Sequence, residues 1–101
     1  QPDFDETNPI TKKFIESYKV RFGTAGIPYG IYTAESYDGV YIIAQAIAQN
    51  GNTAEGIKEY LKNMKSYEGA SGKISFDDNG DGIRNYVVKA VSNGKIVKIE
   101  Q

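Results

Sequence analysis

Cysteine, histidine and tryptophan are all absent from this sequence of 101 residues. Without cysteine and histidine the chain has no disulfide bond, no thiolate or imidazole catalysis, and no ligand set for nearly every zinc or copper site. No serine has a histidine partner, which excludes a catalytic triad. The closest carboxylate pairs lie in polar, turn-like stretches, where nothing raises one pKa as glycoside hydrolysis requires. We therefore expect a protein that is not an enzyme and that uses no cofactor and no metal ion.

Long hydrophobic runs and an excess of one charge are absent too. The longest apolar run, Val40 to Ala44, is far too short to span a bilayer. The 12 basic and 13 acidic residues are mixed along the chain and give a net charge of -1, without a basic stripe for nucleic acid. We therefore expect no nucleic-acid partner. The length allows one domain at most, and a cysteine-free sequence is compatible with export.

Apolar periodicity and capping residues predict three helices. The first begins with Asn8 at the cap and Pro9 at the first helical position, and it ends at Gly23. The stretch 24–30 that follows is rich in glycine and proline and is expected to be a loop. The third helix begins after Thr53, a favoured cap residue, and presents an apolar face of Ile57, Tyr60, Leu61 and Met64.

The central helix is predicted from about Thr33 to Asn50 and is the most apolar segment of the chain. One face repeats at helical spacing and is expected to be buried; its members are Tyr37, Val40, Tyr41, Ala44 and Ala48, and Ile43, Ala46 and Ile47 widen it. Tyr18 and Tyr60, on the other two helices, are also expected to pack into the core. Asp38 has two interpretations: a charge that faces a ligand, or a solvated or backbone-bonded residue near the first turn. The second is favoured, for Asp38 as for Glu35, because acids suit that end of the helix dipole.

A β-pattern follows from Tyr67 onward. Alternation within 72–76 predicts one short strand, and Asn93-Gly94 predicts a hairpin between strands 86–91 and 95–99. A two-residue loop places Lys89 opposite Lys98, and because like charges that face each other belong in solvent, the other face is expected to be buried. That face carries Tyr86, Val88, Ala90, Val97 and Ile99.

The segment Asp77–Gly82, DDNGDG, matches the opening of an EF-hand calcium loop. Such a loop needs a bidentate glutamate at its twelfth position, where this chain has Val88, and it needs flanking helices, where this chain has strands. We therefore expect a polar turn and not a calcium site.

Two stretches resemble a known family. AESYDGVYIIAQAI, from Ala34 to Ile47, and YEGASGKISFDDNGD, from Tyr67 to Asp81, resemble the corresponding motifs of type I periplasmic binding proteins, the substrate-binding components of branched-chain amino acid ABC transporters. Order and spacing agree from about Pro9 to Ile99. The family's chains are several times longer, so we expect this chain to be the C-terminal part of such a protein.

The resemblance implies an α/β fold with two lobes that close on a small ligand, a branched-chain amino acid or a related compound. Residues 8–66 would form the helical part of one lobe, 67–84 a crossover between lobes, and 85–101 a hairpin of the other lobe, within the single unit 1–101. The protein would lie in the periplasm, or outside the cell and associated with the membrane, and would deliver its ligand to an ABC permease. In this family an aromatic residue just ahead of the central helix touches the ligand, a position that matches Tyr32 and, more weakly, Tyr29.

Other interpretations stay open. A sensor or receptor domain of the same fold would contain the same segment, and a stand-alone interaction module could use the exposed tyrosines. The loops that grip the amino and carboxylate groups of the ligand in this family lie upstream of the matched segment. Separate copies of the chain are expected to associate, either through bare apolar faces or by exchange of the hairpin.

Overall fold

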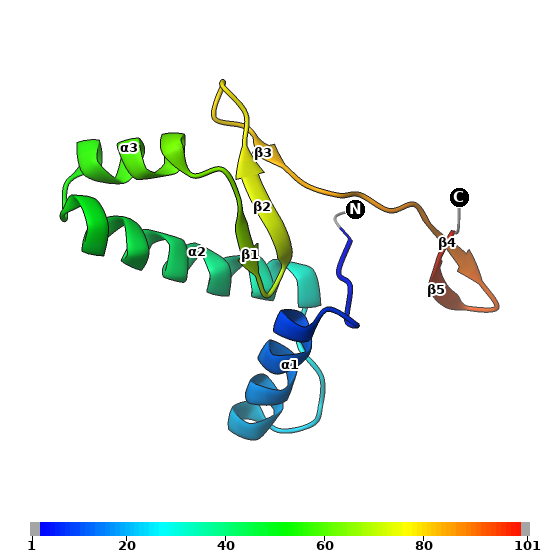
Figure 1. The fold of residues 1–101 in the computed structure, drawn as a ribbon. Coiled ribbons are helices and arrows are strands. Elements are labelled where there is room, and N and C mark those ends of the chain that lie inside the picture. Colours follow the sequence, from blue (N-terminus) through cyan, green and yellow to red (C-terminus); the bar gives the residue numbers. More distant parts are fainter. Residues whose placement is uncertain (1–2, 100–101) are drawn as a thin grey trace.

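The computed structural model describes residues 3–99. Three helices come first and five short strands follow: α1 (Pro9–Phe22), α2 (Gly30–Asn50), α3 (Ala54–Asn63), β1 (Tyr67–Gly69), β2 (Gly72–Phe76), β3 (Gly82–Ile83), β4 (Lys89–Ser92) and β5 (Lys95–Lys98). Helix α2 is the longest element, α3 folds back along it, and β1 and β2 lie over its N-terminal half (Figure 1). The hairpin of β4 and β5 stands apart from this body, at the end of a long connecting segment. The expected mixture of three helices, a short strand and a hairpin is confirmed.

Capping residues set the helix ends as predicted. The Asn8 side chain accepts a hydrogen bond from the backbone N–H of Ile10 at 2.9 Å, and Thr53 Oγ1 accepts one from Gly56 at 3.0 Å. Gly23 and Gly51, at the ends of α1 and α2, have φ angles of 88° and 89°, which glycine adopts without a steric cost.

Helix α2 begins three residues earlier than the sequence predicts. Tyr29 precedes it in the left-handed region, with a φ of 51°, and its carbonyl accepts hydrogen bonds from the N–H groups of Tyr32 and Thr33. Gly30, assigned to the loop by its neighbours, is the first residue of α2. The ring of Phe4 lies against it, and a Cβ atom there would be 3.0 Å from that ring.

The buried face of α2 differs from the predicted one and shares only Ala46 with it. The residues that the rest of the chain covers are Ile31, Ala34, Asp38, Ile42 and Ala46. Val40, on the predicted face, is 70% exposed, and Tyr37 and Tyr41 are 43% and 48% exposed, so their expected burial is wrong for the described residues. Periodicity alone could not separate the two stripes, because α2 carries apolar residues almost all round.

The small core lies where α1, α2 and the β1–β2 turn meet. Phe14, Ala34 and Ala70 are buried there, with Phe4, Ile15, Tyr18 and Ile27 packed around them. Tyr18 is thus partly buried, as is Tyr60, whose hydroxyl donates to Gln45 Oε1 at 3.0 Å and joins α3 to α2. Core packing is therefore confirmed in part for these two tyrosines.

The sheet has more strands than the sequence predicts. The expected strand is present as β2, and it pairs antiparallel with β1 on one side and with β3 on the other. These two partners are only three and two residues long, too short for an alternating pattern to reveal them. Gly69 pairs with Gly72, so Ala70 and Ser71 form the two-residue tip of the β1–β2 hairpin.

The register of the second hairpin is confirmed. Lys89 pairs with Lys98 and Val91 with Ile96, while Asn93 and Gly94 have φ angles of 52° and 74°, as a type I′ turn requires. The expected buried face is the less exposed one, but Val97 and Ile99 are still 42% exposed, and Val88 and Tyr86 more so. That expectation is therefore wrong within the described part of the chain, where neither face of the hairpin is buried.

The segment Asp77–Gly82 contains a polar turn, as predicted. Asp77 Oδ1 accepts hydrogen bonds from the N–H groups of Asn79 and Asp81, both at 2.9 Å. The Asp77 carbonyl accepts a further bond from Gly80 at 3.0 Å, with Gly80 at a φ of 85°. The carboxylate that an ion would need is thus part of the turn.

Replacing Asp77 by alanine should lower the free energy of unfolding by about 1 kcal/mol, because two hydrogen bonds to a carboxylate are lost at an exposed site. Asp78→Ala is the matched control, an exposed neighbouring acid outside these two bonds. Urea unfolding followed by circular dichroism measures both. Equal midpoints for the two variants would contradict a structural role for the Asp77 side chain.

Candidate functional site

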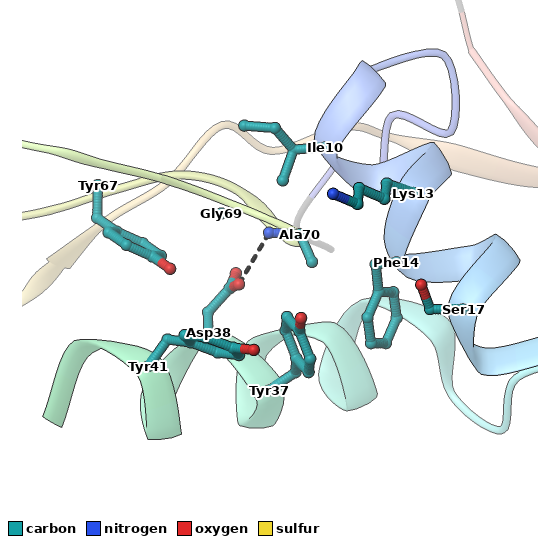
Figure 2. A pocket seen from close by; sticks show the side chains of 10 residues that line it. All are labelled: Ile10, Lys13, Phe14, Ser17, Tyr37, Asp38, Tyr41, Tyr67, Gly69 and Ala70. Carbon is teal, nitrogen blue, oxygen red and sulfur yellow. Dashed lines mark hydrogen bonds between the residues drawn. The ribbon is translucent and has the colours of Figure 1, made fainter. Parts of the chain in front are cut away.

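The tip of the β1–β2 hairpin is held by one buried carboxylate. Asp38, in the middle of α2, is 0% exposed. Its Oδ1 accepts a hydrogen bond from the Ala70 N–H at 2.8 Å, and its Oδ2 accepts from the Ser71 N–H at 2.8 Å and from the Ser71 hydroxyl at 2.5 Å. Figure 2 shows the Asp38 side chain rising from the helix toward Ala70.

The two carbonyl groups of the tip are bonded as well, from two other parts of the chain. Thr11 Oγ1, in α1, donates to the Ala70 carbonyl at 2.7 Å, and Arg84 donates to the Ser71 carbonyl at 2.7 Å. Side chains from three segments therefore satisfy every backbone polar group of a two-residue turn. We call Thr11, Asp38 and Arg84, with the tip that they bind, the clamp.

Gly69 is required by the closeness of α2 to β1. A Cβ atom on this residue would lie 2.4 to 2.6 Å from the carboxyl atoms of Asp38, closer than any real contact. The run Gly69-Ala70-Ser71-Gly72 is small because the backbone must approach the helix closely enough for both amides to reach the carboxylate.

Two expectations about acidic residues need correction. Asp38 is backbone-bonded, but to residues more than 30 positions away and without contact to solvent, so the solvated first-turn interpretation is wrong. Glu35 is also outside the first turn, because α2 starts at Gly30, and it forms an ion pair with Arg84 at 3.4 Å. The sequence offered two signals for the contact between Asp38 and the hairpin tip: an acid on an apolar helix, and a run of small residues at 69–72. The pairing of the two becomes visible only in the folded structure.

A cavity of about 210 Å³ opens beside the clamp. Figure 2 shows it between α1, α2 and β1, with Lys13, Tyr37, Tyr41 and Tyr67 around Asp38. The volume is below the roughly 300 Å³ of typical small-molecule pockets. Its polar lining includes tyrosine and serine hydroxyl groups and the Lys13 ammonium group, which can donate hydrogen bonds.

Two tyrosines of this cavity, Tyr37 and Tyr67, have raised pKa values. A hydrogen bond with Tyr41, followed by burial, raises the pKa of Tyr37 to about 12, and burial raises the pKa of Tyr67. Negative charge at Asp38 adds to both shifts. At neutral pH these groups are therefore hydrogen-bond donors and not phenolates.

The two predicted ligand-binding residues lie together at the N-terminal end of α2, away from this cavity. Tyr32 is in the first turn and 53% exposed; Tyr29 precedes the helix and is 83% exposed. In residues 3–99 no cluster of three acidic side chains is placed to hold a metal ion. Nor does any helix among these residues have the length and apolar character needed to cross a membrane.

Comparison with known proteins identifies the family. The sequence profile of periplasmic binding proteins matches residues 1–95. This chain belongs to the periplasmic binding protein family. Membership of this family implies a location outside the cytoplasm, and the two similar structures described next are both named as binding proteins. A search of curated proteins found no match.

Two solved structures share the fold. A leucine-binding protein, LivK, from Thermotoga maritima is 34% identical with a TM-score of 0.72, and the match covers 95% of this chain and 27% of that one. An ABC transporter substrate-binding protein from Desulfitobacterium hafniense, in complex with leucine, is 26% identical with a TM-score of 0.73, over 95% of this chain and 29% of its own. This chain therefore spans little more than a quarter of each relative and corresponds to a fragment of their fold.

Asp38→Ala should lower the free energy of unfolding by about 3 to 5 kcal/mol, since two buried N–H groups and a hydroxyl lose their acceptor. Asp38→Asn keeps the side-chain volume and one acceptor oxygen, and should cause about half of this loss. Urea unfolding of both variants, with Asp78→Ala as an exposed control, measures the effect. A midpoint for Asp38→Ala close to that of the unchanged chain would contradict the clamp.

The raised pKa of Tyr37 predicts a loss of stability in alkali. The fold favours the protonated phenol, so this contribution is complete below pH 10, the ordinary value, and disappears as the pH rises to about 12. Tyr37→Phe cannot ionise, so its unfolding midpoint should fall less steeply over this range. Denaturant midpoints against pH, with tyrosinate absorbance as the titration signal, test this. Parallel curves for the two proteins would disprove it.

Proposed function

We propose that this chain is part of a solute-binding protein that captures a branched-chain amino acid or a related compound and delivers it to an ABC permease. The supporting observation is the match to two structures, one named a leucine-binding protein and the other a substrate-binding protein solved with leucine. In this role the protein performs no chemistry. Its ligand selects one state of a two-state equilibrium, and the permease at the outer face of the membrane receives that state.

We assign residues 8–66 to the helical part of one lobe, 67–84 to a crossover, and 85–101 to a hairpin of the other lobe. The shape of the described part supports this division, because a connecting segment separates the β4–β5 hairpin from the helical body (Figure 1). Asp3 and Asn85 lie side by side, with the Asp3 N–H donating to the Asn85 carbonyl at 2.9 Å. Two passages of the chain between the lobes would meet at this point.

The residue of this chain that would contact the ligand is Tyr32, with Tyr29 as its neighbour; we call these two residues the ligand edge. Tyr32 is in the first turn of a helix that is anchored at Gly30 by Phe4 and, two turns later, at Asp38 by the clamp. An aromatic ring on such a fixed helix end loses little conformational freedom when a ligand binds. Its half-exposed face can cover an apolar side chain such as that of leucine, which is the chemistry that the proposed ligand requires.

Tyr32→Ala should weaken leucine binding by about 10- to 100-fold, because the buried apolar area is worth about 1 to 3 kcal/mol. The test uses a chimera in which this chain replaces the matching 27% of the Thermotoga leucine-binding protein. Isothermal calorimetry measures the affinity, and circular dichroism confirms the fold.

Tyr41→Ala is the matched control, since Tyr41 lies on the same helix and is 48% exposed, close to the 53% of Tyr32. Its affinity should stay within about twofold of the unchanged chimera. Tyr29→Ala should have a smaller effect than Tyr32→Ala. A folded chimera without leucine binding would contradict the proposed ligand, whereas binding unaffected by Tyr32→Ala would contradict only the proposed ligand edge.

A further inference from the structure

Arg84 holds two parts of the molecule that the sequence keeps far apart. One of its terminal nitrogens lies 2.7 Å from the Ser71 carbonyl and 3.4 Å from Glu35 Oε1. The Arg84 side chain is 11% exposed and that of Glu35 is 37% exposed, so this charge lies at the edge of the buried clamp. A planar guanidinium with several donors can bind both partners at once, which the single ammonium group of lysine does less well.

Because of its position in the chain, Arg84 links the helical body to the segment that leads to the β4–β5 hairpin. The residue follows β3 directly and begins the segment 84–88, which runs to the β4–β5 hairpin (Figure 1). Further contacts hold this segment and the hairpin: the Asp3 N–H donates to the Asn85 carbonyl at 2.9 Å, and Lys98 forms a more exposed ion pair with Asp3 at 3.4 Å. Because exposed pairs contribute little to stability, we expect Arg84 to constrain where this segment leaves the helical body more strongly than the Lys98–Asp3 pair does.

The second partner of Arg84 lies next to the proposed ligand edge. Glu35 follows Tyr32 by three positions, which places the two side chains on neighbouring turns of one face of α2. Asp38, which holds the Ser71 amide and hydroxyl, follows Glu35 by another three. The N-terminal part of α2, the tip of the β1–β2 hairpin and the start of segment 84–88 thus meet at the guanidinium group of Arg84.

We propose that Arg84 is a positioning residue that fixes the direction in which the crossover leaves the helical lobe, and thereby links the Tyr32 end of α2 to the placement of the hairpin. Arg84 touches no ligand in this role. Its effect on affinity would come from how often the hairpin occupies the ligand-competent position. This effect on affinity rests on the proposed function, whereas the fixed direction of the crossover does not.

The first experiment measures the direction in this chain alone. The sequence has no cysteine, so Ala48→Cys on α2 and Lys95→Cys on β5, both exposed, accept spin labels at unique sites. Pulsed electron–electron double resonance measures the distance between the two spin labels. It should give one narrow distance distribution for the labelled chain and a clearly broader one after Arg84→Ala. Arg84→Lys and Glu35→Gln should give intermediate widths, because each keeps one of the two contacts.

Lys73→Ala is the matched control, since Lys73 lines the same side of the tip but forms no ion pair within residues 3–99. It should leave the distribution unchanged. A distribution that is already broad with Arg84 present, or one that Arg84→Ala does not alter, would overturn the proposal. If Arg84→Ala fails to fold by circular dichroism, the two conservative variants decide in the same way.

The second experiment measures leucine affinity in the chimera described above. Arg84→Ala should weaken binding by about 3- to 10-fold with the same stoichiometry, and Lys73→Ala by less than about twofold. An affinity that is the same for Arg84→Ala and the unchanged chimera would overturn the link to ligand binding. If the unchanged chimera binds no leucine, the proposed function fails, and the spin-label result still decides the role of Arg84.

Discussion

The buried carboxylate of Asp38 is the constraint on which the rest of this structure depends. Three hydrogen bonds to a charged acceptor contribute about 1.5 to 3 kcal/mol each, against a penalty of several kcal/mol for removing the charge from water. The hydrogen bonds offset the cost of burying the carboxylate, and removal of the carboxylate, as in Asp38→Ala, leaves their buried donors unpaired. Its importance lies in the alternative, because any arrangement that pulls the hairpin tip away leaves a bare charge in the interior.

Geometric requirements spread outward from this one group. The tip must approach α2 closely, so Gly69 has no room for a Cβ atom. Once the amides of Ala70 and Ser71 point at Asp38, their carbonyls point away from it, and Thr11 and Arg84 must come from other segments to bond them. Hydrogen bonds from α1 and from the start of segment 84–88 thus converge on the hairpin tip that Asp38 holds.

Interactions between near neighbours in the sequence were the predictable part of this fold. The Asn8 and Thr53 caps and the Asn93-Gly94 turn each depend on residues within a few positions, and the structure confirms them. The partner of Asp38 lies more than 30 residues away, and no local pattern reveals it. The buried stripe of α2 was missed for the same reason: a helix that is apolar almost all round does not show in its own sequence which side its neighbours will cover.

Apolar contacts and hydrogen bonds play different parts in this structure, because only hydrogen bonds depend strongly on direction. Apolar contacts are non-directional, so the small core around Phe14 can hold the helices and the tip together without fixing their angles. Hydrogen bonds at 2.7 to 2.8 Å from three segments do fix them, since such bonds weaken steeply when bent. One similar structure is solved with leucine, and in the function proposed above the helical lobe would have to keep its shape while ligand binding shifts one lobe against the other. A polar clamp at the point where the chain leaves the helical body therefore supplies an orientation that a core of this size, built from apolar residues alone, would leave undefined.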